Sequence, residues 1–285
     1  MSANPTAPRI LFPADLAAAC RIQSSPRTRG RLIAGGTDLM AQFAAGVPVP
    51  DRLVSLKNLP GLTGIAITPD LVEIGAATPH AAIRDDARLR PLLPALVAAS
   101  SSVGARQIQA TGTLGGNVAN ASPAGDTAPA LLVTGGLVLL ASVRGPRTVP
   151  LESFWTGYRQ TAAAPDEIIV SFLLPPRGRA KETFRKIGTR AAQAISKIMI
   201  ATRILVKKGA IEHAAVAMGS VAATPVRLTA LERWLQGRPL TPSLPDEAAS
   251  VVRETVHPID DIRSTADYRR WAAGQLAADA LRTLL

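Results

Sequence analysis

A seventeen-residue stretch, ATGTLGGNVANASPAGD at residues 110–126, places the strongest constraint on how this chain can fold. It combines four glycines with short hydroxyl and amide side chains, and it holds almost no side chain large enough to build a core. It also shows no clear helix or strand period. We therefore expect an irregular segment whose backbone N–H groups approach an anion closely.

A second pair of glycines, Gly35 and Gly36, lies in IAGGTDLM at residues 33–40, which we call the first glycine segment. It follows a predicted strand, and Thr37 and Asp38 supply an N-cap-like start to a helical turn. N–H groups exposed at such a start bind phosphate oxygens. Taken alone, this pattern is more often an ordinary tight turn.

The sequence TLGGN at residues 113–117, the second glycine segment, repeats the paired glycines beside a hydroxyl and an amide. Alone it is equally compatible with a surface loop. Two such segments without GxGxxG or GxxxxGK[ST] argue against Rossmann and P-loop sites. They favour a diphosphate held from both sides without a lysine. Asp126 then accepts from a ribose hydroxyl, caps the following helix, or does both.

Length and residue counts limit the class of protein. A chain of 285 residues predicts about two domains. The single cysteine, Cys20, excludes an internal disulfide and a cysteine-ligated iron–sulfur cluster. His80, His213 and His257 lie far apart, so we interpret them as ordinary surface or core histidines and not as metal ligands. No spanning helix or signal peptide is expected, which favours a reducing cytoplasm.

The net charge of +11 is concentrated between Arg177 and Lys208, where ten Lys or Arg residues face one acid, Glu182. Such a run is compatible with nucleic acid, an anionic ligand or an acidic protein partner. Phe184 is the only aromatic residue in it, which disfavours nucleic acid. We favour a solvated face that directs two or three cations at a ligand.

The pattern of elements indicates an α+β protein. The first part alternates short helices and strands, beginning with a helix from Pro13 and including a helical region broken around Pro91 and Pro94. A helix ends at Gly135, and the strands GLVLLAS and EIIVSFLLP follow. PPRGRAK then marks a boundary near residues 175–180. Beyond it we predict three strands, and helices over 226–236, 245–256 and 266–285 on one face of the sheet.

Four quoted segments carry a family resemblance: AGGTDLM, GARQIQATGTLGGNVANASPAGDTAPALL, FWTGYRQTAAAPDEIIVSFLLP and FRKIGTRAAQAISKIMIA. In this order they resemble the FAD-binding, medium subunit of the molybdenum hydroxylases. This is the flavoprotein subunit of carbon monoxide dehydrogenase and the FAD-binding part of xanthine dehydrogenase. The resemblance runs from roughly residue 10 to the C-terminus. Its most specific part is T-x-GGN-x-x-x-ASP-x-x-D with ISK downstream.

The resemblance implies a vanillyl-alcohol oxidase-type (PCMH-type) FAD-binding domain at residues 1–178, with two α+β subdomains of roughly 1–58 and 59–178 and FAD between them. A small three-strand, three-helix domain of carbon monoxide dehydrogenase flavoprotein type follows at 179–285. Asp126 would hold an FAD hydroxyl, and Lys186 would place a cation near the flavin or its tail. The full set of implied FAD-binding residues is Ile33, Ala34, Gly35, Gly36, Thr37, Asp38, Leu39, Met40, Thr113, Gly115, Gly116, Asn117, Asp126, Ile169 and Lys186.

Two departures from related proteins bear on the cofactor. Related flavoproteins often carry His after the first glycine pair, where this chain has Thr37, so we expect non-covalent FAD. Some family members hold an iron–sulfur cluster in this subunit, which the single cysteine excludes here. The chain is therefore expected to carry neither an iron–sulfur cluster nor molybdenum.

The implied function is electron transfer within an oxidoreductase complex. Substrate is hydroxylated at a molybdopterin centre on a large subunit, and electrons pass through iron–sulfur clusters of a small subunit to this FAD, then to NAD or another acceptor. No catalytic acid–base set is recognisable in this chain. One alternative is a stand-alone FAD-dependent oxidoreductase acting on a small molecule. Another is a non-enzymatic module that binds RNA through its charge, although charge alone does not explain two paired-glycine segments.

Overall fold

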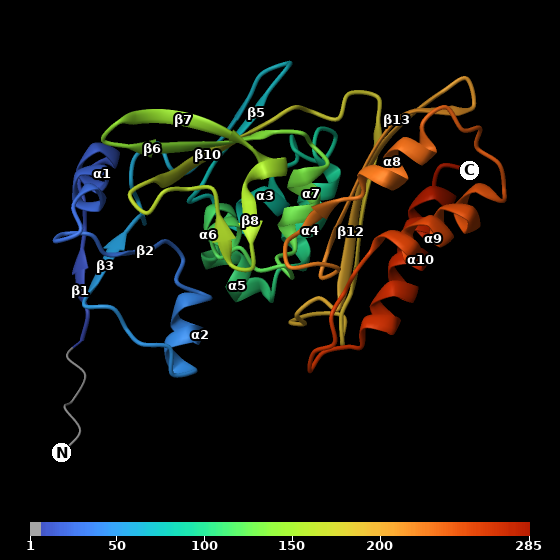
Figure 1. Ribbon diagram of the computed structural model, residues 1–285. Helices are drawn as coiled ribbons and strands as arrows, with labels where there is room; N and C mark the ends of the chain where they lie inside the picture. Colours follow the sequence, from blue (N-terminus) through green and yellow to red (C-terminus); the bar gives the residue numbers. More distant parts are fainter. Residues whose placement is uncertain (1–6) are drawn as a thin grey trace.

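The computed structural model describes residues 7–285. Figure 1 shows three blocks side by side in chain order, which we call the N-terminal block (7–58), the central block (59–178) and the C-terminal block (179–285). Within the described residues, no helix is both long and apolar enough to cross a membrane.

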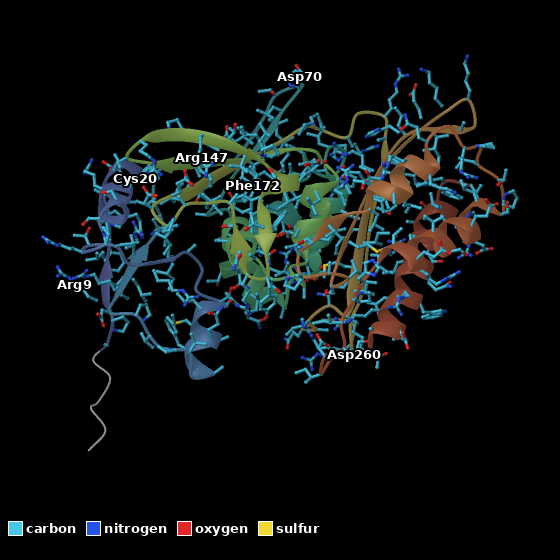
Figure 2. All side chains as sticks on the ribbon, viewed as in Figure 1. Arg9, Cys20, Asp70, Arg147, Phe172 and Asp260 are labelled. Carbon is cyan, nitrogen blue, oxygen red and sulfur yellow. The ribbon has the colours of Figure 1, made fainter. Side chains whose placement is uncertain are left out.

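The N-terminal block is a small parallel sheet with two helices. Its strands are β1 (Arg9–Leu11), β2 (Arg31–Ile33) and β3 (Arg52–Ser55), in the order β1-β3-β2, and its helices are α1 (Leu16–Ser24) and α2 (Leu39–Ala44). Helix α1 begins at Leu16 and not at Pro13, because the Asp15 side chain accepts a hydrogen bond from the Ala18 N–H at 2.6 Å. Cys20, labelled on this helix in Figure 2, is buried against the central block.

The central block contains a five-stranded antiparallel sheet in the order β4-β5-β10-β6-β7. These strands are β4 (Ile65–Ile67), β5 (Val72–Gly75), β6 (Leu137–Ser142), β7 (Gly145–Pro150) and β10 (Ile168–Leu174). The sheet's Phe172, labelled near the middle of Figure 2, is fully buried. A 3-10 turn, η1 (Leu151–Ser153), and a short hairpin, β8 (Trp155–Gly157) with β9 (Gln160–Thr161), join β7 to β10.

Five helices cover the central sheet: α3 (His80–Asp85), α4 (Pro94–Ser102), α5 (Arg106–Thr111), α6 (Leu114–Ala119) and α7 (Thr127–Leu132). The interruption predicted around Pro91 and Pro94 separates α3 from α4, and Pro94 is the first residue of α4, where its missing N–H costs nothing.

The glycine-rich stretch is more regular than its composition predicts. Residues 113–117 form the start of α6 and not an open loop. The Thr113 side chain caps the helix by accepting from the Gly116 N–H at 3.1 Å, and Leu114 and Val118 are buried. A capping bond and the burial of two apolar side chains therefore outweigh the low helix propensity of two glycines.

The C-terminal block is an antiparallel sheet with helices on one face (Figure 1). Its strands, in the order β11-β12-β13-β14, are β11 (Lys181–Ile187), β12 (Ile198–Lys207), β13 (Ala210–Gly219) and β14 (Val226–Arg227). The helix predicted over 226–236 begins only at Thr229, because Val226–Arg227 pair with β13 as the two-residue β14, so three strands were predicted where the sheet has four. The helices are α8 (Thr229–Leu235), α9 (Leu244–Thr255) and α10 (Ala266–Arg282).

Strand β12 is buried on both faces. Ile198 and Ile200 share a core with α8–α10, whereas Met199 and Ala201 belong to the core of the central block. Side chains alternate between the faces of a strand, so burial on both sides produces a continuous apolar run. The second face of the C-terminal sheet contacts α4 and α7.

A buried ion pair reinforces this contact between the blocks. Arg203 on β12 donates from Nε to Glu182 Oε1 at 2.6 Å, and Glu182 Oε2 accepts from the Ala95 N–H of α4 at 3.1 Å. The Arg203 and Glu182 side chains are only 9% and 1% exposed. Burial raises the pKa of Glu182, and the Arg203 guanidinium opposes that rise.

Removal of Arg203 would leave the Glu182 carboxylate buried without its counter-charge. We expect Arg203→Leu to lower the free energy of unfolding by about 3 kcal/mol. The matched control is Lys207→Leu on the same strand, which breaks an exposed pair with Glu212 and should cost less than about 1 kcal/mol. Urea unfolding of both variants measures the difference. Equal losses would contradict this role of the buried pair.

Candidate functional site

A cleft of 840 Å³ opens where the three blocks meet. It is lined by β2 and the loop leading to α2, by α5, α6 and the residues up to Asp126, by the β8–β9 turn, and by the loop 190–195 with Arg263. Its volume lies within the range of about 300–1,000 Å³ that is common for small-molecule and cofactor sites.

The first wall of the cleft depends on a contact that only glycine allows. A Cβ atom on Gly35 would lie 2.0 Å from the Thr111 carbonyl oxygen at the end of α5, so the two backbones touch directly. Gly36 has a φ of +70°, a conformation that side chains disfavour. Among the described residues, the N–H groups of Gly35, Gly36 and Thr37 donate to no backbone carbonyl. They are therefore available to a ligand.

The opposite wall is the first turn of α6. A Cβ atom on Gly116 would meet only Thr113 Oγ1, at 3.0 Å, so the remaining space beside this backbone is open. Asn117 also lines the cleft, where its Oδ1 accepts from Thr127 Oγ1 at 2.6 Å. The two glycine segments thus face one cleft from two sides.

Asp126 lines the cleft but is held by the C-terminal block. Its Oδ2 lies 2.5 Å from Lys186 Nζ, and its Oδ1 accepts from Ser196 Oγ at 2.6 Å. Burial raises the pKa of Asp126, and the Lys186 charge opposes that rise. The Asp126 side chain makes no capping bond to α7. The Asp126 carboxylate thus links the central block to the C-terminal block and is also part of the cleft wall.

Met40, Gly115, Ile169 and Lys186 do not line the cleft, unlike the other predicted site residues. Met40 is 46% exposed, and Ile169 pairs with Leu140 inside the central core. Gly115 is needed for packing, because a Cβ there would lie 2.7 Å from the Ala76 carbonyl oxygen, which accepts the Gly115 N–H. Lys186 neutralises Asp126 and donates to the Ser102 carbonyl at 3.0 Å.

A polar bridge that the sequence does not reveal connects residues of the cleft lining. Gln42 of α2 accepts from Arg31 at 2.9 Å and donates to Asn120 Oδ1 at 3.3 Å. Arg159, in the β8–β9 turn, donates to the same oxygen at 3.3 Å. The bridge joins the N-terminal and central blocks through residues far apart in the sequence.

His80 is a second cleft residue that sequence analysis did not identify. It is the first residue of α3, its N–H donates to the Gly112 carbonyl at 3.0 Å, and its side chain is 1% exposed. Burial lowers the pKa of His80 to about 4. The imidazole is therefore neutral at physiological pH. The three histidines are not spaced as metal ligands are, so nothing in the sequence indicated that His80 would line the cleft.

The charges of the cleft favour an anionic ligand. Arg31, Arg159, Arg190 and Arg263 line it, against Asp38 and the paired Asp126. Within residues 7–285, no group of His, Cys, Asp and Glu is arranged to hold a metal ion. Free backbone donors on the first wall and open space beside Gly116 on the second, with cations around them, fit the diphosphate of a dinucleotide without requiring a lysine.

Both parts of the chain match known protein families. The family model described as "FAD binding domain in molybdopterin dehydrogenase" matches residues 6–177, and "CO dehydrogenase flavoprotein C-terminal domain" matches residues 182–284. The chain is 31% identical over 244 residues to the xanthine dehydrogenase FAD-binding subunit of Escherichia coli O157:H7, covering 85% of this chain and 84% of that protein.

Two further relatives match over nearly the whole chain. The nicotine 6-hydroxylase medium subunit of Paenarthrobacter nicotinovorans is 29% identical over 270 residues, covering 94% of each protein. A solved structure of carbon monoxide dehydrogenase from Hydrogenophaga pseudoflava superposes with a TM-score of 0.93 at 25% identity, covering 98% of each chain.

The buried His80 predicts a pH-dependent stability. Its ordinary pKa is 6.5, so between pH 6.5 and about 4 the unfolded chain binds a proton that the folded chain does not. The free energy of unfolding therefore falls as pH drops through this window, by about 3 kcal/mol in total, and this effect is absent above it. His80→Phe should lose that part of the dependence in urea unfolding of the ligand-free chain at pH 7.5 and 4. The same pH dependence in both proteins would contradict a buried neutral His80.

Proposed function

Since the chain belongs to the FAD-binding, medium-subunit family of the molybdenum hydroxylases, we propose that it holds FAD in this cleft and relays electrons between an iron–sulfur partner and an acceptor. Membership confirms the resemblance and the α+β fold predicted from the sequence. The chain is a subunit of an oxidoreductase complex of the xanthine dehydrogenase and carbon monoxide dehydrogenase type.

The observation that carries this proposal is the pair of glycine segments facing one cleft. The free N–H groups of Gly35, Gly36 and Thr37 would donate to one side of the FAD diphosphate. The open backbone at Gly116 would admit the other side, with Thr113 and Asn117 beside it. Backbone donors already positioned by the fold bind an anion without the entropy cost of ordering long side chains. Ile33, Ala34, Asp38 and Leu39 complete the cleft wall in this proposal.

The remaining predicted residues would act on the shape of the site. Lys186 would hold the Asp126 carboxylate in place. Each Asp126 oxygen has one partner, Lys186 or Ser196, so the carboxylate keeps further lone pairs that could accept from an FAD hydroxyl. Gly115 would seat α6 beside the end of β5, and Ile169 would support the central sheet. Met40 would lie beside Gly36, where a Cβ atom would be 3.7 Å from Met40 Cγ.

FAD would be bound without a covalent link and would be the only redox group on this chain. Thr37 occupies the position where related flavoproteins carry a histidine for attachment. The single cysteine, Cys20, is buried on α1 and one thiolate does not hold an iron–sulfur cluster. Bound FAD supplies the redox chemistry, and the chain supplies binding and orientation.

The assembly in this proposal follows from the relatives. Carbon monoxide dehydrogenase of Hydrogenophaga pseudoflava has a chain named as medium, which implies large and small partner subunits. An iron–sulfur small subunit and a molybdopterin large subunit are the proposed partners here, and NAD or another molecule is the proposed acceptor. We also propose the division into an FAD-binding domain at 1–178 and a second domain at 179–285.

The first test is the visible spectrum and subunit composition of the purified protein. We expect oxidised-flavin absorption, FAD in the supernatant after acid treatment, and copurification with subunits that contain iron–sulfur clusters and molybdenum. A colourless protein with the cleft intact would overturn FAD binding. A single yellow chain that turns over an organic substrate would instead support a stand-alone flavoenzyme.

The second test adds a single methyl group to the open backbone of α6. We expect Gly116→Ala to weaken FAD binding at least about tenfold, because the methyl occupies the space that a phosphate oxygen would take. The unfolding midpoint of the ligand-free variant is the internal control and should be unchanged or raised, since alanine favours the helix. Full FAD affinity in a folded Gly116→Ala protein would contradict the placement of the diphosphate.

A further inference from the structure

His80 lies where the two glycine segments meet. A Cβ atom on Gly112 would lie 3.2 Å from Thr37 Oγ1 and 3.6 Å from His80 Cδ2, so the imidazole is adjacent to both walls of the cleft. The residue before it, Pro79, forms an isolated bridge with Thr113, the cap of α6. The backbone leading into the histidine is thus tied to the start of the second glycine segment, because the Thr78 carbonyl also accepts from the Leu114 N–H at 3.1 Å.

The side chain is almost fully buried and yet unsatisfied. Nδ1 is buried and has no hydrogen-bond partner among the described residues, although His80 is one of the residues that line the cleft. A buried N–H without an acceptor is rarer in proteins than an unused acceptor lone pair. The proton of the neutral ring therefore belongs on Nε2, and Nδ1 keeps its lone pair in the dry interior.

We infer that His80 is a further dinucleotide-binding residue, whose neutral Nε2–H donates a hydrogen bond to an oxygen of the bound diphosphate. This inference rests on the proposed function, because it takes FAD as the occupant of the cleft. Protonation of the ring would add a buried N–H at Nδ1 with nothing to accept it. The residue therefore supplies a donor and not a charge.

The neutral donor explains why a buried histidine stands at this place. Arginines already line the cleft, and a fifth cation would have to be desolvated beside the packed α5–α6 junction. A neutral imidazole donates to an anion without that penalty. The hydrogen bond would also fix the start of α3 relative to the ligand, since the His80 N–H donates to the Gly112 carbonyl.

Two substitutions separate the donor from the shape of the ring. His80→Phe keeps a ring of similar size without a donor, and His80→Gln keeps an N–H group near the position of Nε2. We expect the full-length chain with His80→Phe to bind FAD about tenfold more weakly, and His80→Gln to stay within about threefold of the parent, in fluorescence titrations of the ligand-free protein. His213→Gln, at an exposed position outside the cleft, is the matched control and should leave FAD affinity unchanged.

Each outcome decides the inference. Unchanged FAD affinity in folded His80→Phe would overturn it, as would equal weakening by Phe and Gln, which would show a role of the ring's shape alone. If His80→Phe does not fold, nitrogen NMR of the parent chain replaces it. The inference is supported if the ring proton lies on Nε2 in the free protein and the Nε2 resonance changes when FAD binds. An Nε2 resonance that FAD leaves unchanged overturns it. Absence of FAD binding by the parent chain would instead overturn the proposed function.

Discussion

The contact between the Gly35 backbone and the Thr111 carbonyl is the constraint on which the cleft depends. It allows the N-terminal and central blocks to meet backbone to backbone, with no side chain between them. Thr111 ends α5, and the next residues are fixed in turn: the Gly112 carbonyl accepts from His80, the Leu114 N–H donates to Thr78, and the Gly115 N–H donates to Ala76. The position of both walls is therefore set by main-chain contacts that do not vary with rotamer.

Buried ion pairs also hold the blocks together. The basic run between Arg177 and Lys208 was predicted to be a solvated face with a few cations directed at a ligand. Two of its members are instead buried between blocks, Lys186 with Asp126 and Arg203 with Glu182. In each pair the cation stabilises the ionised carboxylate, whose pKa burial would otherwise raise further. The run thus contributes to the joint between blocks as well as to surface charge.

The sequence predicts most elements of the fold and much of the cleft, and the reasons for its failures are physical. Alternation and apolar stripes identify strands such as β5 and helices such as α10, because their burial follows a local period. The paired glycines of the first segment mark a tight backbone contact. The α6 helix was missed because buried Leu114 and Val118 stabilise it against the propensity of its glycines. His80 and the Gln42–Asn120 bridge were missed because their partners are distant in the chain.

Strand β12 is covered by α8–α10 on one face and by the central block on the other. Alternate residues of β12 therefore pack against two different sets of neighbours. In a chimera that joins the first half of this protein to the second half of a relative, Met199 and Ala201 would be replaced by residues shaped for another α4 and α7. Such an exchange would succeed only if the inner face of the sheet and those two helices were transplanted together, so the unit of recombination crosses the boundary between the halves.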